Sequence, residues 1–96
     1  MVDRVQLLLN AQKALLGAIH PNIRGISVAW EEGTFTWRVY FDEEPNQEDK
    51  EEMSIACTET LAGLQEFVLI QEELHIVPYP KPIQNIGEWV YLRREK

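Results

Sequence analysis

The chain has 96 residues, which suits one compact domain, and we expect residues 1–96 to share a single core. Its 16 acidic and 9 basic residues give a net charge of −7, which repels the phosphates of nucleic acid and the head groups of anionic lipid. Its apolar runs are far shorter than the roughly 20 residues that span a bilayer. Composition therefore argues against binding to nucleic acid or insertion into a membrane, and favours basic protein partners.

An amphipathic helix is predicted from about Asp3 to Ile19, because apolar residues recur there every three or four positions. Asp3 is suited to cap its start, and Pro21 cannot continue a helix. The polar residues inside this segment argue against a signal peptide, and a single cysteine, Cys57, agrees with a reducing compartment, so we expect a cytoplasmic protein. The face expected to be buried comprises Val5, Leu8, Leu9, Gln12, Leu15, Leu16 and Ile19.

A β-hairpin is predicted next, because the apolar period changes from about four residues to two. Gly33 lies between the two alternating runs and can supply the positive φ of a short turn. Trp30 and Trp37 fall in the apolar phase and are expected in the core. The alternating residues are Ile26, Val28 and Trp30 in the first run and Phe35, Trp37, Val39 and Phe41 in the second.

A second helix is predicted from about Gln47 to Ala62, with Asn46 as its cap and Gly63 as its end signal. Two further strands should follow, one from Phe67 to Val77, bulged near Glu72, and a shorter one from Trp89 to Arg93. The prolines of PYPKP, residues 78–82, favour an extended, polyproline-like connection between them. The order is α-β-β-α-β-β, an α+β fold with two helices on one face of a four-stranded, mainly antiparallel sheet.

No catalytic or metal-binding constellation is evident. Cys57 has no base in a recognisable motif and lies on the apolar side of the second helix, where a buried structural thiol is expected. His20 and His75 are far apart in sequence and lack the spacing of a zinc site. The run DEEPNQEDKEE has no calcium-loop pattern. We therefore predict a protein that is not an enzyme and needs neither a metal ion nor another cofactor.

Acidic residues gather in the connections, where they could steer a basic partner. The alternative is a solvated helix start, since carboxylates in a first helical turn are stabilised by the helix dipole. Tyr79, Trp89 and Tyr91 are the aromatic residues best suited to an interface. The predicted partner-binding residues are Glu31, Glu32, Asp42, Glu43, Glu44, Glu48, Asp49, Glu51, Glu52, Tyr79 and Trp89.

Three stretches together cover most of the chain: KALLGAIHPNIRGISVAW (13–30), VYFDEEPNQEDKEEMS (39–54) and PKPIQNIGEWVYLRRE (80–95). They resemble bacterial immunity proteins of the contact-dependent growth inhibition type. The resemblance implies a cytoplasmic protein that binds and blocks the toxic domain of a cognate effector, often a nuclease, and we expect the toxin to be basic. The alternative hypothesis is a small structural or regulatory domain whose acidity serves only solubility. Such a domain could form a homodimer through a free edge strand.

Overall fold

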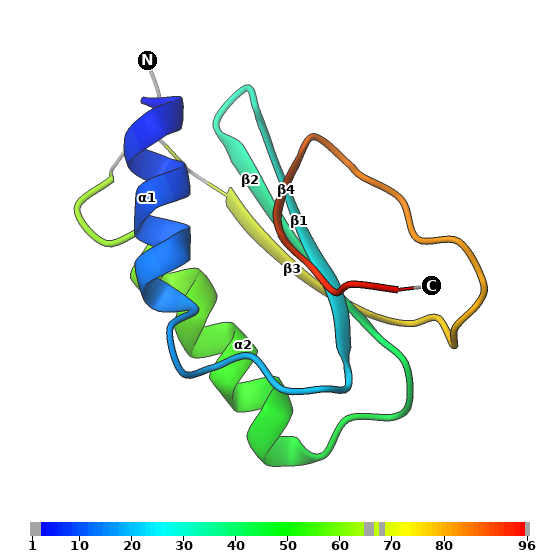
Figure 1. The fold of residues 1–96 in the computed structure, drawn as a ribbon. Helices are drawn as coiled ribbons and strands as arrows, with labels where there is room; N and C mark the ends of the chain where they lie inside the picture. Colours follow the sequence, from blue (N-terminus) through cyan, green and yellow to red (C-terminus); the bar gives the residue numbers. More distant parts are fainter. Residues whose placement is uncertain (1–2, 65–66, 68, 96) are drawn as a thin grey trace.

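A computed structural model describes residues 3–64, 67 and 69–95, and it confirms the predicted α-β-β-α-β-β order and the α+β class. Both helices lie on one side of a four-stranded sheet, and the connection from β3 to β4 runs along its other side (Figure 1). We call these sides the helix face and the open face. The elements are α1 (Arg4–Ala14), β1 (Ile23–Glu31), β2 (Thr34–Phe41), α2 (Gln47–Thr60), β3 (Leu69–Ile76) and β4 (Glu88–Leu92).

The sheet is mixed, with strand order β3-β2-β1-β4. β1 is antiparallel to both β2 and β4, whereas β3 runs parallel to β2. The parallel pair arises because α2 carries the chain back along the sheet between β2 and β3, the usual way to join parallel neighbours. Both β3 and β4 are therefore edge strands, and the hairpin occupies the centre of the sheet.

Both helices start where the sequence predicts. The Asp3 carboxylate accepts a hydrogen bond from the amide of Gln6 (3.1 Å), and the Asn46 side chain accepts one from the amide of Asp49 (2.8 Å). Both helices end earlier than predicted, α1 at Ala14 and α2 at Thr60. Glycines with φ near +80° follow each end by three residues, a conformation that a right-handed helix cannot include.

The buried face of α1 differs from the predicted one. Leu8 and Ile19 are only partly buried against the core, and the predicted face is wrong for four residues that stay exposed. Apolar residues occupy more than half of the circumference of α1, so their periodicity alone does not determine which face is buried. The small side chain of Ala11 lets the helix approach α2 and the sheet closely. The residues buried are Leu7, Ala11 and Leu15, and the exposed ones are Val5, Leu9, Gln12 and Leu16.

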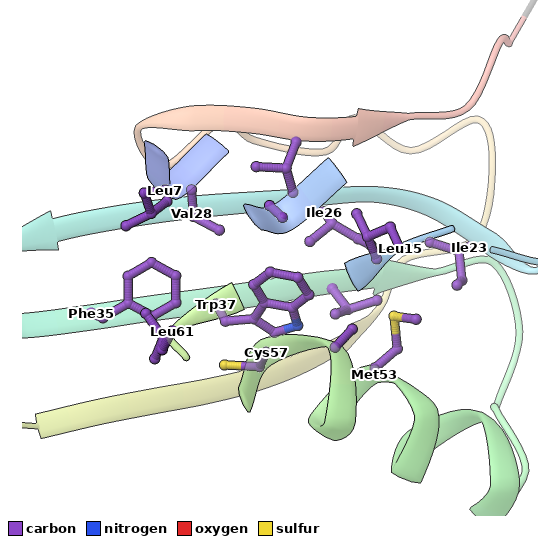
Figure 2. Packing of buried hydrophobic residues seen from close by; sticks show 14 of the residues in the cluster. Leu7, Leu15, Ile23, Ile26, Val28, Phe35, Trp37, Met53, Cys57 and Leu61 are labelled. Atoms are coloured by element: carbon purple, nitrogen blue, oxygen red, sulfur yellow. The ribbon is translucent and has the colours of Figure 1, made fainter. Parts of the chain in front are cut away.

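The hairpin turns through Glu32 and Gly33, whose φ values are +48° and +79°. Two consecutive positive φ values give the turn that matches the twist of the flanking strands. Trp37 is fully buried, and Figure 2 shows its indole ring between the sheet and α2, near Met53 and Cys57. Trp30 is only half-buried and packs at the margin of this core.

Two local predictions near the C-terminus need correction. The bulge near Glu72 is wrong, because β3 keeps an unbroken register with β2 and the irregularities fall in β1. The edge position explains how Glu72 can occur among the apolar residues of β3 without a bulge, since its carboxylate reaches water beside α2. The PYPKP segment contains a turn, in which the Lys81 amide donates to the Pro78 carbonyl (2.9 Å), so it is not continuously extended. β3 and β4 otherwise lie within one or two residues of prediction, and residue 68 of the predicted third strand lies outside the described residues.

Candidate functional site: an acidic helix face

The outer side of α2 carries three of the nine predicted binding carboxylates. Helical spacing places them around one large apolar side chain, Ile55, which is 57% exposed. Glu48 and Glu52 are four residues apart, about 6 Å along the helix axis. We define the acidic face of α2 as Glu48, Glu51, Glu52, Ile55 and Glu59.

Glu43 and Glu44 continue the acidic surface into the connection between β2 and α2, where both are exposed. Asn22 fixes this connection, because its side-chain amide donates to the Glu43 carbonyl (3.1 Å) and its side-chain oxygen accepts from the Glu43 amide (2.7 Å). No ion pair of Glu43, Glu44 or the carboxylates of the acidic face is found with the described residues. These charges are therefore available to an external cation.

Two other predicted binding residues are engaged inside the molecule. Asp42 accepts from the Tyr79 amide (2.8 Å) and from the guanidinium of Arg93 (3.1 Å), and these bonds lower the pKa of its carboxyl. Asp49 lies 3.2 Å from Nε2 of His20, although the geometry is not that of a hydrogen bond. The bonds of Asp42 join the β2–α2 connection to the β3–β4 connection and to the C-terminal tail, which the sequence did not predict.

Glu31 and Glu32 are not brought together with the acidic face. They lie at the hairpin turn, at the opposite end of β2 from Asp42, and eight strand residues separate the two ends by roughly 25 Å. The predicted acidic residues thus form two separate groups.

Two of the three predicted interface aromatics, Tyr79 and Trp89, lie on the open face, whereas Tyr91 packs partly buried against the hydrophobic core. Trp89 is half-buried and packs over Gly25, where an added Cβ would come within 2.9 Å of its Cζ3 atom. Its ring also lies 6.2 Å from that of Tyr40. Tyr79 is 42% exposed and stacks on the guanidinium of Arg24 at 5.5 Å. Trp89 is therefore a packing residue first, whereas Tyr79 presents an accessible ring.

A buried cation beneath Tyr79 escaped the sequence analysis. Arg24 is 2% exposed and makes two hydrogen bonds with the Glu95 carboxylate, of 2.7 and 2.9 Å. Its remaining nitrogen donates to the carbonyls of Val77 (2.6 Å) and Lys81 (2.7 Å). These bonds tie the β3–β4 connection and the C-terminal tail to the sheet. An arginine inside the apolar run IRGISVAW indicates a buried cation, but the run does not reveal which distant residue pairs with it.

The remaining candidate groups show no catalytic arrangement in the described residues. Burial, with a smaller contribution from the charge of Glu72, raises the pKa of the Cys57 thiol to about 12, so it stays protonated at neutral pH. His20 stacks against Phe41, and His75 contacts the edge of the Tyr40 ring. Within residues 3–64, 67 and 69–95, no group of three or more His, Cys, Asp and Glu side chains could hold a metal ion.

Comparison with known families decides the assignment. The family model described as "MafI2 immunity protein" matches residues 4–95. The chain belongs to the MafI2 immunity protein family. Membership supports toxin neutralisation by binding a cognate toxin, and proteins of this family are generally not enzymes. The Maf toxin system differs from contact-dependent growth inhibition, so the MafI2 match supports the immunity assignment and does not confirm that type.

Other comparisons add little to the MafI2 assignment. The chain is similar to the metal-bound C-terminal domain of the CzcD transporter from Thermotoga maritima, at 15% sequence identity and a TM-score of 0.41. The alignment covers 83% of this chain and 98% of that domain, and we base no argument on so distant a likeness. A comparison with curated proteins gave no match. In the described part of the chain, no helix has the length and apolar character needed to cross a membrane.

Proposed function

We propose that the chain neutralises a basic toxin domain, a nuclease, by covering its nucleic-acid-binding surface with the acidic face of α2. A nuclease must present lysine and arginine to the phosphates of its substrate. Carboxylates repeated along an exposed helix compete for the same cations. The observation that carries the proposal is the set of carboxylates around Ile55, none of which forms an ion pair with a described residue.

Ile55 gives the proposed interface an apolar centre. Exposed at 57% and flanked by acidic residues, it can enter a pocket on the toxin while the charges around it meet basic groups. The surrounding carboxylates would increase the association rate, and the buried side chain of Ile55 would lower the dissociation rate. We also propose a cytoplasmic location, where the lone thiol of Cys57 remains reduced.

The test uses two double variants that remove the same charge from different places. Glu48→Gln with Glu51→Gln neutralises the acidic face, and Glu31→Gln with Glu32→Gln neutralises the remote hairpin turn. The wild-type chain first captures its partner from source-cell lysate at low salt, and the eluted protein is assayed for cleavage of DNA and RNA with and without the chain. Association rates with that protein are then measured for each variant at several salt concentrations.

The proposal expects a captured basic nuclease that the chain inhibits. The acidic-face variant should then associate about tenfold more slowly at low salt with a shallower salt dependence, and the hairpin variant should stay within about twofold of wild type. Equal effects of the two variants would remove the acidic face from the interface. A captured toxin without nuclease activity would refute the nuclease part alone. A stable dimer that captures nothing would favour the alternative of a structural or regulatory homodimer.

A further inference from the structure

Within the described part of the chain, the outer edge of β3 has no partner strand. β3 is the terminal strand of the sheet, and among the described residues only β2 pairs with it. The Leu69 amide donates to the Gly33 carbonyl (3.2 Å) and the Val77 amide to the Phe41 carbonyl (2.8 Å). In a parallel ladder, alternate residues direct their backbone groups to the same neighbour. The odd-numbered residues of β3 therefore face β2, and the amides and carbonyls of the even-numbered residues face outward.

The even-numbered residues also turn their side chains to the helix face. In register they stand beside Phe35, Trp37, Val39 and Phe41, all of which are fully buried. Helix α2 covers those β2 residues but only the inner margin of β3, so three apolar side chains of β3 remain between 42% and 50% exposed. We define the β3 docking edge as Ile70, Glu72, Leu74 and Ile76.

A groove runs between the β3 docking edge and α2. It has a volume of about 410 Å³, and its walls include Cys57 and Thr58 from α2, Leu61 just after that helix, and Ile70 and Glu72 from β3. Its lining is mainly apolar, with one carboxylate. The groove shares α2 with the acidic face, which lies on the outer side of the same helix.

Glu72 gives this edge a specific charge preference. Its side chain is exposed and forms no ion pair with the described residues, whereas Glu73, on the open face of the same strand, pairs with Arg38 at 2.6 Å. The charge of Glu72 contributes to the raised pKa of Cys57, which lines the groove, and this agrees with a Glu72 carboxylate directed toward the groove. A strand added along β3 would place its own side chains beside these residues. A cation opposite Glu72 would complete the pairing.

The geometry points to β3 as a docking edge for an extended segment of the toxin with the pattern apolar–x–basic–x–apolar. Main-chain hydrogen bonds to β3 hold the segment, its basic residue meets Glu72, and its apolar residues cover Ile70 and Leu74. The inference rests on the proposed function for the identity of the partner as a toxin. The chemistry of the edge itself requires only a basic, extended peptide.

A second copy of this chain fits the edge less well. In antiparallel pairing, residues directly opposite each other share a face, so Glu72 would meet an even-numbered residue of the other β3. None of the even-numbered residues of β3 is basic, and one register places Glu72 against itself. Each copy also carries a net charge of −7. Acidic residues on an exposed edge are a common protection against self-pairing.

The first test uses a peptide and the full chain. The probe is an acetylated, amidated peptide, Thr-Val-Thr-Lys-Thr-Val-Thr, and the control peptide has Glu in place of Lys. Binding is followed by NMR through the backbone amides of the ¹⁵N-labelled chain. We expect the largest changes at the outward-facing amides of residues 70, 72, 74 and 76, with smaller changes at residues 71, 73 and 75, and weaker binding of the control peptide.

Two variants test the charge preference. Glu72→Lys reverses the charge in the groove. Gln71→Lys is the control, because it also introduces a lysine, but on the open face of the same strand. The first should weaken binding of the lysine peptide about fivefold or more and strengthen binding of the glutamate peptide. The second should change either affinity less than about twofold. Reversed peptide preference in Glu72→Lys also demonstrates that the variant folds.

Each result supports or overturns the docking edge. Binding with the expected pattern and reversed preference supports it. No saturable shifts at millimolar peptide, or equal responses of the two variants, would overturn it. So would a concentration-dependent dimer whose formation shifts these same amides, because a second copy would then occupy the edge. Failure here together with slowed toxin association in the Glu48/Glu51 variant would refute the docking edge and leave the proposed function intact.

Discussion

Replacing Arg24 with methionine should destabilise the fold more than any other single loss of charge in the described chain. Methionine keeps most of the aliphatic stem and removes every donor. The substitution breaks the two bonds to Glu95 and frees the carbonyls of Val77 and Lys81. It therefore releases the β3–β4 connection and the C-terminal tail at the same time.

The expected cost follows from the surroundings of the lost partners. Removing one member of a buried ion pair costs about 3 to 5 kcal/mol when the other remains buried. The side chain of Glu95 is 20% exposed, and Lys81 lies in an exposed turn, so water can replace part of what is lost. We expect the free energy of unfolding to fall by about 2 to 3 kcal/mol. In a domain of this size, that corresponds to a Tm lower by about 10 to 20 °C.

Thermal unfolding followed by circular dichroism measures this change, with Arg94→Met as the control because Arg94 is exposed and adjacent to Glu95 in sequence. The hydrogen bond from Arg24 lowers the pKa of the Glu95 carboxyl below its ordinary value of 4.5. A lowered folded-state pKa stabilises the fold above about pH 4.5, and that contribution is lost as the pH falls through the folded-state pKa. The difference between wild type and Arg24→Met should therefore narrow in acid. A Tm within about 3 °C of the control at pH 7, or an undiminished difference in acid, would refute the reasoning.

Three further predictions concern packing and the thiol. Gly25→Ala should lower the free energy of unfolding in urea by about 1 to 3 kcal/mol, because its Cβ would meet Trp89 at 2.9 Å; an unchanged midpoint would show that the ring shifts freely. Leu7→Ala should cost about 2 to 5 kcal/mol in the same assay, and Leu9→Ala much less, since Leu7 is fully buried and Leu9 is 51% exposed; equal costs would contradict this difference in burial. Cys57, buried and with a pKa of about 12, should resist a disulfide reagent at pH 8 until the chain unfolds, and rapid labelling of the folded chain would contradict its burial.

The sequence predicted features that depend on neighbouring residues. The side chains of Asp3 and Asn46 cap helices by accepting from backbone amides three positions away, and Gly33 forms its turn with the residue beside it. Such chemistry is complete within a few residues, so the element order and the helix starts were predictable. The buried face of α1 was not, because the choice between Leu7 and Leu9 depends on the sheet and α2, which pack against the helix from distant parts of the chain.

The candidate site was predictable in composition and not in arrangement. The sequence identifies Glu48 and Glu51 on a helix start, but only strand direction reveals that Glu31 lies at the far end of β2. The engagement of Asp42 with Tyr79 and Arg93 joins residues that are 37 and 51 positions away. Arg24 and Glu95 are 71 positions apart. Contacts at these separations leave no local pattern, so single-sequence reasoning could not distinguish a binding carboxylate from an internal one.

The strand order has a consequence for synthesis of the chain. Of the fifteen buried core residues in the described chain, only Val90 follows residue 61. As the chain emerges from the N-terminus, it can bury nearly all of its core before β3 or β4 exists. During that interval both sides of the β1–β2 hairpin present unpaired backbone groups, because the strands that flank it come last. A nascent chain stalled before residue 69 would thus be well collapsed and yet open to association along both sides of its hairpin.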